Sequence, residues 1–123
     1  MAQAEPIVFF NGELKPESQV GISIRDRGYL YGDAVFDAAR TFNGTPFRLP
    51  EHIHRLYDSL RYLRIDVGLK HSEMEDWSRQ VIEHNYKLLP RGQDMWVMQR
   101  ISRGIEPILP DDVMRPTILI ETH

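Results

Sequence analysis

Short apolar runs bounded by turn residues predict strands near both ends of the chain. Residues 7–10 form such a run and meet residues 13–15 across Asn11-Gly12, the pattern of a hairpin closed by a two-residue turn. Residues 95–101 and 117–121 predict two further strands near the other end. The loop between these two strands is rich in proline and aspartate.

A second hairpin carries the most regular alternation in the chain. Residues 35–42 meet residues 45–48 across Asn43-Gly44, a dipeptide suited to the positive φ angles of a type I′ turn. Side chains two apart share one face of a regular strand. One face should therefore carry Phe36, Ala38, Arg40 and Phe42, and the other Val35, Asp37, Ala39 and Thr41.

Between these strands the hydrophobic period changes to that of helices. A first helix should begin at Pro50 and end before Gly68, since apolar residues recur there at intervals of three and four. A second helix should begin at a capping box of Ser72 and Glu75 and end near residue 90. The two apolar stripes consist of Ile53, Leu56, Leu60 and Leu63, and of Met74, Trp77, Val81 and Leu88. The sum is an α+β fold, a two-layer sandwich of an antiparallel sheet with two helices on one face, and residues 1–123 should form a single domain.

Composition excludes several classes of function. The formal charge of -3 arises from 15 basic and 18 acidic residues spread along the chain, which does not suggest a nucleic-acid partner. There is no cysteine, so no disulfide and no thiolate site can form. The spacing of His52 and His54 is not that of a helical metal pair, and no glycine-rich nucleotide loop occurs. No apolar run suggests a membrane span, so a cytoplasmic protein is expected.

Two segments resemble the signature of a known family. These are residues 27–40, Arg-Gly-Tyr-Leu-Tyr-Gly-Asp-Ala-Val-Phe-Asp-Ala-Ala-Arg, and residues 52–56, His-Ile-His-Arg-Leu. They resemble the N-terminal domain of the class IV (fold type IV) pyridoxal-phosphate enzymes. This family includes branched-chain and D-amino-acid aminotransferases, R-selective amine transaminases and aminodeoxychorismate lyase. The resemblance covers essentially the whole chain and is most specific between residues 24 and 65.

The resemblance implies that the chain is the small N-terminal domain of such an enzyme. The lysine that binds the cofactor covalently lies, in the family, in a second domain beyond the point that corresponds to His123. Lys15, Lys70 and Lys87 stand in contexts typical of solvated surface lysines. No catalytic residue is therefore assigned within this chain.

Arg55 corresponds to the family arginine that binds the phosphate of pyridoxal 5′-phosphate. Judged from the sequence alone, Arg55 could instead pair with Glu51 or Asp58 on the surface of its helix. By the same resemblance Tyr31 and Arg40 should lie on the substrate side of the pocket. Without it, Tyr31 could be an ordinary packing tyrosine, whereas a buried Arg40 would need an anionic partner.

The strand at residues 95–101 departs from the best-known relatives. Branched-chain aminotransferases usually carry tyrosine and arginine where this chain has Trp96 and Met98. The arginine and histidine with which D-amino-acid aminotransferases hold the carboxylate are also replaced, by Ile108 and Leu109. The substrate-binding residues predicted from the resemblance are Tyr31, Phe36, Arg40, Trp96, Met98 and Arg103, with Phe36 as an apolar wall and Arg100 as a further anion contact. Trp96 and Met98 could equally belong to the core of the sheet.

Three functions are compatible with these features. The first is part of an aminotransferase that moves an amino group between an amino acid or amine and a 2-keto acid. The second is a lyase of the same family, which would release an aromatic product instead of forming a keto acid. The third is a non-catalytic binding or assembly module. The resemblance also implies a homodimer or tight association with a chain that supplies the C-terminal domain, through an apolar face and the loop after Arg103.

Overall fold

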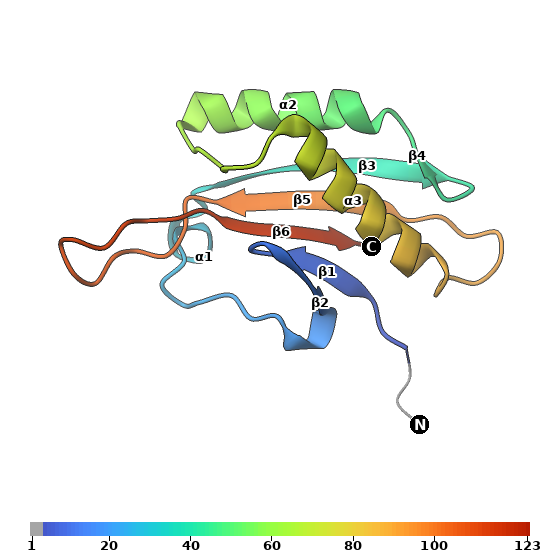
Figure 1. The fold of residues 1–123 in the computed structure, drawn as a ribbon, viewed down its shortest axis with the longest axis horizontal. Coiled ribbons are helices and arrows are strands. Elements are labelled where there is room, and N and C mark those ends of the chain that lie inside the picture. The colour runs from blue at the N-terminus through green and yellow to red at the C-terminus, as the bar shows by residue number, and fades with distance from the viewer. Residues whose placement is uncertain (1–3) are drawn as a thin grey trace.

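Six antiparallel strands form one sheet in the computed structural model, which describes residues 4–123. The strands are β1 (Ile7–Phe10), β2 (Glu13–Pro16), β3 (Ala34–Phe42), β4 (Thr45–Pro46), β5 (Trp96–Ser102) and β6 (Thr117–Thr122). The helices are α1 (Arg27–Tyr31), α2 (Leu49–Leu63) and α3 (His71–Tyr86), with a 3-10 turn η1 (Glu17–Gln19). The strand order is β2-β1-β6-β5-β3-β4. Figure 1 shows α2 and α3 on one face of the sheet, which confirms the predicted α+β sandwich.

Both predicted hairpins form. Asn11 and Gly12 have φ angles of 48° and 105°, and Asn43 and Gly44 have φ angles of 51° and 79°. Two successive positive φ angles are what a two-residue hairpin turn of type I′ requires. The strand after the second turn is shorter than predicted, because Arg48 already adopts a left-handed conformation before α2.

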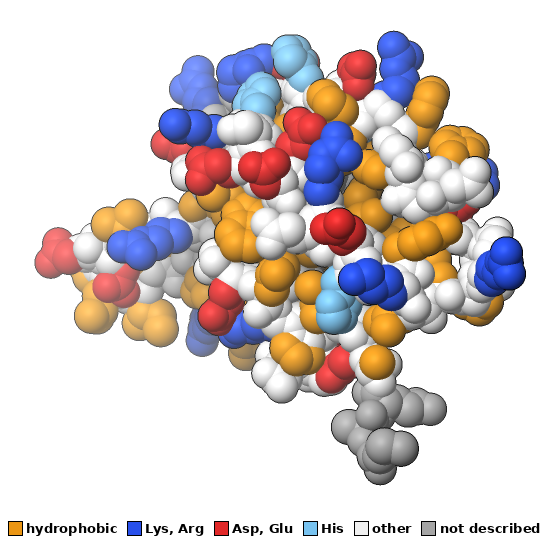
Figure 2. All heavy atoms as spheres, turned by 45° about the vertical axis from the view of Figure 1, so that its right-hand side comes forward, with side chains coloured by type: hydrophobic (Ala, Val, Ile, Leu, Met, Phe, Trp, Pro, Cys, Tyr) orange, Lys and Arg blue, Asp and Glu red, His pale blue; other side chains and the backbone are white. Residues whose placement is uncertain are grey.

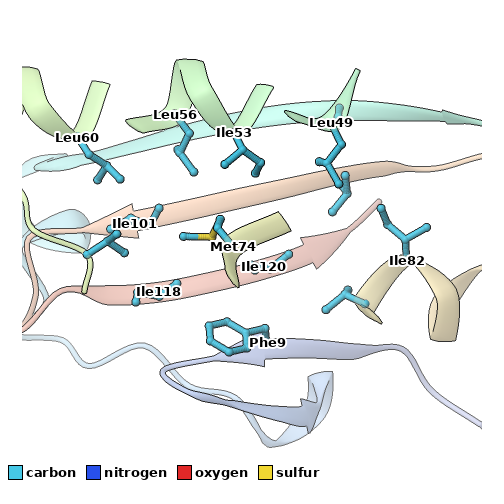
Figure 3. Close-up of a cluster of buried hydrophobic side chains, with 14 of the residues drawn as sticks. Phe9, Leu49, Ile53, Leu56, Leu60, Met74, Ile82, Ile101, Ile118 and Ile120 are labelled. Atoms are coloured by element: carbon cyan, nitrogen blue, oxygen red, sulfur yellow. The ribbon is translucent and has the colours of Figure 1, made fainter. Parts of the chain in front are cut away.

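The core lies between the sheet and the two long helices (Figure 3). Helix α2 buries Leu49, Ile53, Leu56 and Leu60, so its predicted stripe is confirmed with Leu63 at its partly buried margin. Helix α3 buries Met74 and Val81, while Trp77 packs on Phe9 of β1 with 4.7 Å between ring centroids. Fully burying such side chains contributes about 1.5–3 kcal/mol each. This layer therefore provides most of the hydrophobic stabilisation.

Two predictions for α3 are wrong. Its N-cap residue is Lys70, whose backbone N–H donates to the Glu73 carboxylate at 2.9 Å, so Ser72 lies inside the helix and not at its cap. The helix also ends at Tyr86, and Leu88 lies beyond it on the surface. Glu73 thus makes the hydrogen bond from the third helical residue back to the N-cap N–H that is typical of a capping box. Lysine, however, is not a residue that commonly caps a helix.

Candidate functional site

The face of the sheet opposite α2 and α3, called here the open face, carries most of the predicted substrate residues. In the register of β3 and β5, Phe36 lies opposite Arg100, Ala38 opposite Met98 and Arg40 opposite Trp96. Directly opposed residues of an antiparallel pair project to the same side. The predicted division of residues 35–42 into two faces is confirmed, because Asp37, Ala39 and Thr41 are all buried on the helical side.

Large apolar side chains are exposed on the open face. Phe36 is 62% exposed, and Phe42 and Trp96 are each 50% exposed. The alternative that Trp96 belongs to the core is therefore wrong, while Met98 is half-buried. Exposed aromatic clusters of this kind mark binding surfaces more often than isolated exposed residues do.

Arg40 is exposed, which corrects the expectation that it is buried and needs an anionic partner. Its guanidinium lies over the Phe42 ring, 4.6 Å from the centroid. It takes part in none of the ion pairs formed within residues 4–123, and Asp37 is on the other face. Hydrogen bonds from Gly44 and Thr41, with a smaller effect from the nearby charge of Arg40, lower the pKa of Asp94. No ion pair joins Arg40 to Asp94, so the guanidinium can still bind an anion.

Arg100 and Arg103, in contrast, are paired with carboxylates. Arg100 Nε donates to Glu121 Oε1 at 2.6 Å, and its guanidinium lies 5.7 Å from the Phe36 centroid. Arg103 Nε donates to Asp33 Oδ2 at 2.7 Å and its Nη2 donates to the Leu63 carbonyl at 2.9 Å. Both guanidinium groups are therefore less available to a further anion than that of Arg40.

Tyr31 ends helix α1, an element that hydrophobic periodicity does not predict because it is only five residues long. The Asp26 carboxylate accepts the Gly28 N–H at 2.8 Å and starts the helix, while Gly32 ends it in a left-handed conformation. Tyr31 is 63% exposed, with Arg27 5.0 Å from its ring centroid. It is therefore not the packing tyrosine of the alternative prediction.

An ion-pair network fixes α1 to the loop after β5. Asp33 accepts from both Arg103 Nε and Arg27 Nε, and Arg27 Nη1 also donates to Glu106 at 2.8 Å. Hydrogen bonds from Arg103 and then Arg27 lower the pKa of Asp33 despite partial desolvation. Arg103 thereby holds the turn that carries Tyr31.

Arg55, in the second turn of α2, binds Asp37 and not Glu51 or Asp58. Its Nε donates to Asp37 Oδ2 at 2.7 Å and its Nη2 to Oδ1 at 2.9 Å. His52 Nδ1 lies 2.8 Å from the same Oδ1. Burial raises the pKa of Asp37, but hydrogen bonds from Arg55 and His52 outweigh burial and leave that pKa below its usual value. A side-on pair of this kind fixes the plane of the guanidinium.

One side of the Arg55 guanidinium faces outward. The side chain is 67% exposed, and Nη1 donates to no group within the described residues. Beside it is a hollow of about 430 Å³, which is lined by Val35, Arg55, Asp58, Ser59, Tyr62 and Leu63. A guanidinium with two free N–H donors at such a hollow can bind a phosphate.

Sequence reasoning missed the partners Asp37 and His52. A signal for both was present, since Asp37 falls on the face otherwise occupied by buried residues, and His52 precedes Arg55 by three residues on one side of α2. A larger hollow of about 980 Å³ lies elsewhere, beside the β1–β2 turn and the β5–β6 loop. None of the predicted site residues lines it.

Residues 4–123 contain neither a group of side chains suited to a metal ion nor a helix suited to crossing a membrane. No three His, Asp or Glu side chains are grouped there so that they could hold a metal ion. None of the helices in this part of the chain is both long and apolar enough to cross a membrane.

Basic and acidic side chains are interspersed on the face shown in Figure 2.

Comparison with known proteins identifies curated relatives. The model of the family described as amino-transferase class IV matches residues 34–120. A D-alanine aminotransferase of Bacillus licheniformis is 34% identical over 100 residues, which are 81% of this chain and 34% of that protein. A putative branched-chain-amino-acid aminotransferase of Methanocaldococcus jannaschii is 36% identical over 98 residues, or 80% of this chain and 32% of that protein. The chain thus aligns with about a third of the length of these relatives.

Solved structures share the fold, and the sequence relatives identify the family. A branched-chain aminotransferase of Thermoproteus uzoniensis with norvaline has a TM-score of 0.79 at 20% identity, covering 98% of this chain and 41% of that one. A branched-chain amino acid aminotransferase of T.th., complexed with N-(5′-phosphopyridoxyl)-L-glutamate, has a TM-score of 0.80 at 21% identity, covering 97% of this chain and 40% of that one. At these identities the likeness concerns the fold alone. Together with the family model, which matches more than half of the chain, the sequence relatives show that this chain belongs to the class IV aminotransferase family.

Proposed function

We propose that this chain is the N-terminal part of a pyridoxal-phosphate-dependent aminotransferase that moves an amino group between an amino acid or amine and a 2-keto acid. The observation that carries the proposal is Arg55, held from one side by Asp37 and free on the other. The open face on the opposite side of β3 from Asp37 supplies the surface for the substrate. Family membership supports both assignments.

The residues present fit the cofactor's phosphate. Arg55 offers its Nη1 donors beside the hollow that Val35 and Ser59 help to line, and the charge of Asp37 is already engaged by Arg55 and His52. Pyridoxal phosphate, when bound, supplies the electron sink for proton transfer at the substrate carbon. The part of this chain is to bind and orient its phosphate.

Arg40 is the candidate for the substrate carboxylate. Of the three arginines predicted as anion contacts, Arg100 and Arg103 have carboxylate partners and Arg40 has none within residues 4–123. Phe36, Trp96 and Met98 would contact the apolar part of the substrate. Tyr31 would approach it from α1, and Arg103 would act on this turn through Asp33.

The lysine of the reaction should lie outside residues 1–123. Lys15 Nζ pairs with Glu13 at 3.2 Å on the edge strand β2, and Lys70 and Lys87 flank α3. None of the three is on β3, β5 or α2, the elements that carry the candidate site. The share of each relative that this chain covers supports a second region that provides the lysine.

The loop between β5 and β6 is the proposed contact with a second copy of the protein. It projects from the sheet in Figure 1 and carries apolar side chains outward in Figure 2. Ile108, Leu109 and Val113 are 82%, 62% and 79% exposed. We therefore expect a homodimer. The expected location of the protein is the cytoplasm.

The test is amino transfer by the native protein that carries this sequence. D-alanine, L-leucine and a simple amine are each offered with 2-oxopentanoate, a keto acid with one carboxylate, and the keto acid or aldehyde formed from the donor is measured. Keto acid formation that depends on added pyridoxal phosphate is expected. Release of an aromatic product without transfer would identify the lyase instead, and a protein that neither retains the cofactor nor transfers an amino group would contradict the proposal.

A further inference from the structure

The open face contains a second cation, Arg100, immediately beside Phe36. In the β3–β5 register the two residues are directly opposed, and the guanidinium lies 5.7 Å from the Phe36 centroid. Arg100 Nη2 also contacts the Met98 sulfur at 3.3 Å, so the guanidinium lies over the middle of the open face. If Phe36 contacts the substrate side chain, the Arg100 guanidinium lies beside that side chain too.

Arg100 is neutralised by a residue of the next strand. Its Nε donates to Glu121 Oε1 at 2.6 Å, and Glu121 lies opposite Met98 in the β5–β6 register. The Glu121 side chain is only 16% exposed, whereas that of Arg100 is 44% exposed. The carboxylate is thus the enclosed member of the pair and the guanidinium the member that a ligand can reach.

Glu121 is held in its ionised form. Burial acts to raise its pKa, but hydrogen bonds from Arg100 and then His123 outweigh burial and lower that pKa. A second carboxylate approaching Arg100 would therefore meet a cation whose charge is already balanced and an anion beside it. Charge-assisted hydrogen bonds of this length are among the strong ones, so Glu121 is not readily displaced.

The two arginines of the open face consequently differ in kind. Arg40 has no carboxylate partner within residues 4–123, and Arg100 has one. Between them on this face lie Ala38 and Met98, which are small and flexible respectively, so no bulky rigid group separates the two cations. A substrate with one carboxylate needs Arg40 alone, whereas a substrate with two would also require Arg100.

We propose that Glu121 is a specificity-determining residue: by pairing with Arg100 it makes the site favour substrates with one carboxylate and an apolar side chain over dicarboxylates. This inference rests on the proposed function, because it takes the open face to be the substrate surface. Specificity of this type works by an unfavourable element against the competing ligand as much as by contacts to the preferred one.

The test compares two acids of equal length in the native holoprotein. Dissociation constants for pentanoate and glutarate are measured by calorimetry, which requires no turnover. The Michaelis constants of 2-oxopentanoate and 2-oxoglutarate provide a second readout. In Glu121→Gln, which keeps an oxygen acceptor but no charge, glutarate should bind about tenfold more tightly, as expected when one charged hydrogen bond becomes available. Pentanoate binding should be unchanged.

Three controls make the outcome specific. Glu13→Gln removes a carboxylate from the edge strand β2, where it pairs with Lys15, and should alter neither acid. The double variant Arg100→Met/Glu121→Gln should lose the gain for glutarate. Glu121→Thr removes the same charge with a strand-forming residue and replaces Glu121→Gln if that variant does not fold.

The possible failures are distinguishable. If the wild-type protein binds pentanoate and both Glu121 variants leave the glutarate to pentanoate ratio unchanged, this inference is overturned while the proposed function stands. A gain that persists in the double variant would also overturn it, because Arg100 would then have no part. A wild-type protein that binds neither acid would overturn the proposed function together with this inference.

Discussion

Asp37 connects the interior of the protein to its candidate cofactor site. Its carboxylate is 3% exposed and engages Arg55 and His52, while Arg55 is largely in solvent. Removing the carboxylate leaves an exposed arginine that water can solvate. Removing Arg55 instead leaves a buried charge with fewer partners, which is the costlier defect.

Asp37→Asn should lower the free energy of unfolding at neutral pH by about 1.5–3 kcal/mol, the range for hydrogen bonds to charged groups. Because the folded-state pKa of Asp37 is lowered, its stabilising contribution is present above the unfolded value near 3.8 and is lost as the pH falls through the folded value. The deficit of Asp37→Asn, measured by urea denaturation, should therefore shrink below about pH 4. A deficit that is constant from pH 7 to pH 3 would contradict this assignment.

Arg55→Met should destabilise the protein more than Asp37→Asn at pH 7. In this variant the burial of Asp37 is opposed by fewer hydrogen bonds, so its folded-state pKa rises relative to the wild type. Lowering the pH then protonates the buried carboxylate and relieves the defect. The measurement is denaturation of both variants at pH 7 and pH 4, and equal losses at both values would count against a buried Asp37 charge.

For helices and strands, hydrophobic periodicity and turn residues predict much more of the structure than capping residues do. The stripe of α2 and the Asn-Gly turns follow from local rules and form as expected. The start of α3 depends on which of several polar residues near it reaches an open N–H, and Glu73 does so at Lys70. Helix α1 is too short for any periodic signal, and its cap by Asp26 is evident only from the structure.

Two alanine variants distinguish the predicted cap of α3 from the observed one. Glu73→Ala removes the acceptor of the Lys70 N–H and should cost about 0.5–2 kcal/mol, the range for lost caps. Ser72→Ala should change stability by no more than about 0.5 kcal/mol, as for most surface positions. Thermal denaturation of both variants decides between them. The reverse order of effects would restore the cap at Ser72.

At the scale of the whole molecule, the sequence was sufficient for the layers of the sandwich and for the face on which each β3 residue lies. It was not sufficient for the partners of charged residues. Arg55 pairs with Asp37, 18 positions away, and Arg100 with Glu121, 21 positions away. Such pairs depend on strand order and register, which the local pattern does not specify. That Arg40 forms no ion pair within residues 4–123, unlike Arg100 and Arg103, could be recognised only from the structure.

The projecting β5–β6 loop gives a prediction about assembly. Ile108→Glu/Val113→Glu should weaken self-association, because two exposed apolar side chains become charged at the proposed contact. Analytical ultracentrifugation measures the change, with Leu88→Glu beyond α3 as a surface control. An unchanged sedimentation coefficient for the double variant would place the contact elsewhere.

The assignment of Arg55 to the phosphate of the cofactor can be tested with two forms of the cofactor. The dissociation constants of pyridoxal phosphate and of pyridoxal, which lacks the phosphate, are measured for the native protein and for Arg55→Met. We expect the variant to bind pyridoxal phosphate at least about tenfold more weakly, since a charged contact is lost, and to bind pyridoxal as tightly as the native protein does. Equal affinity of both proteins for pyridoxal phosphate would show that Arg55 does not bind the phosphate.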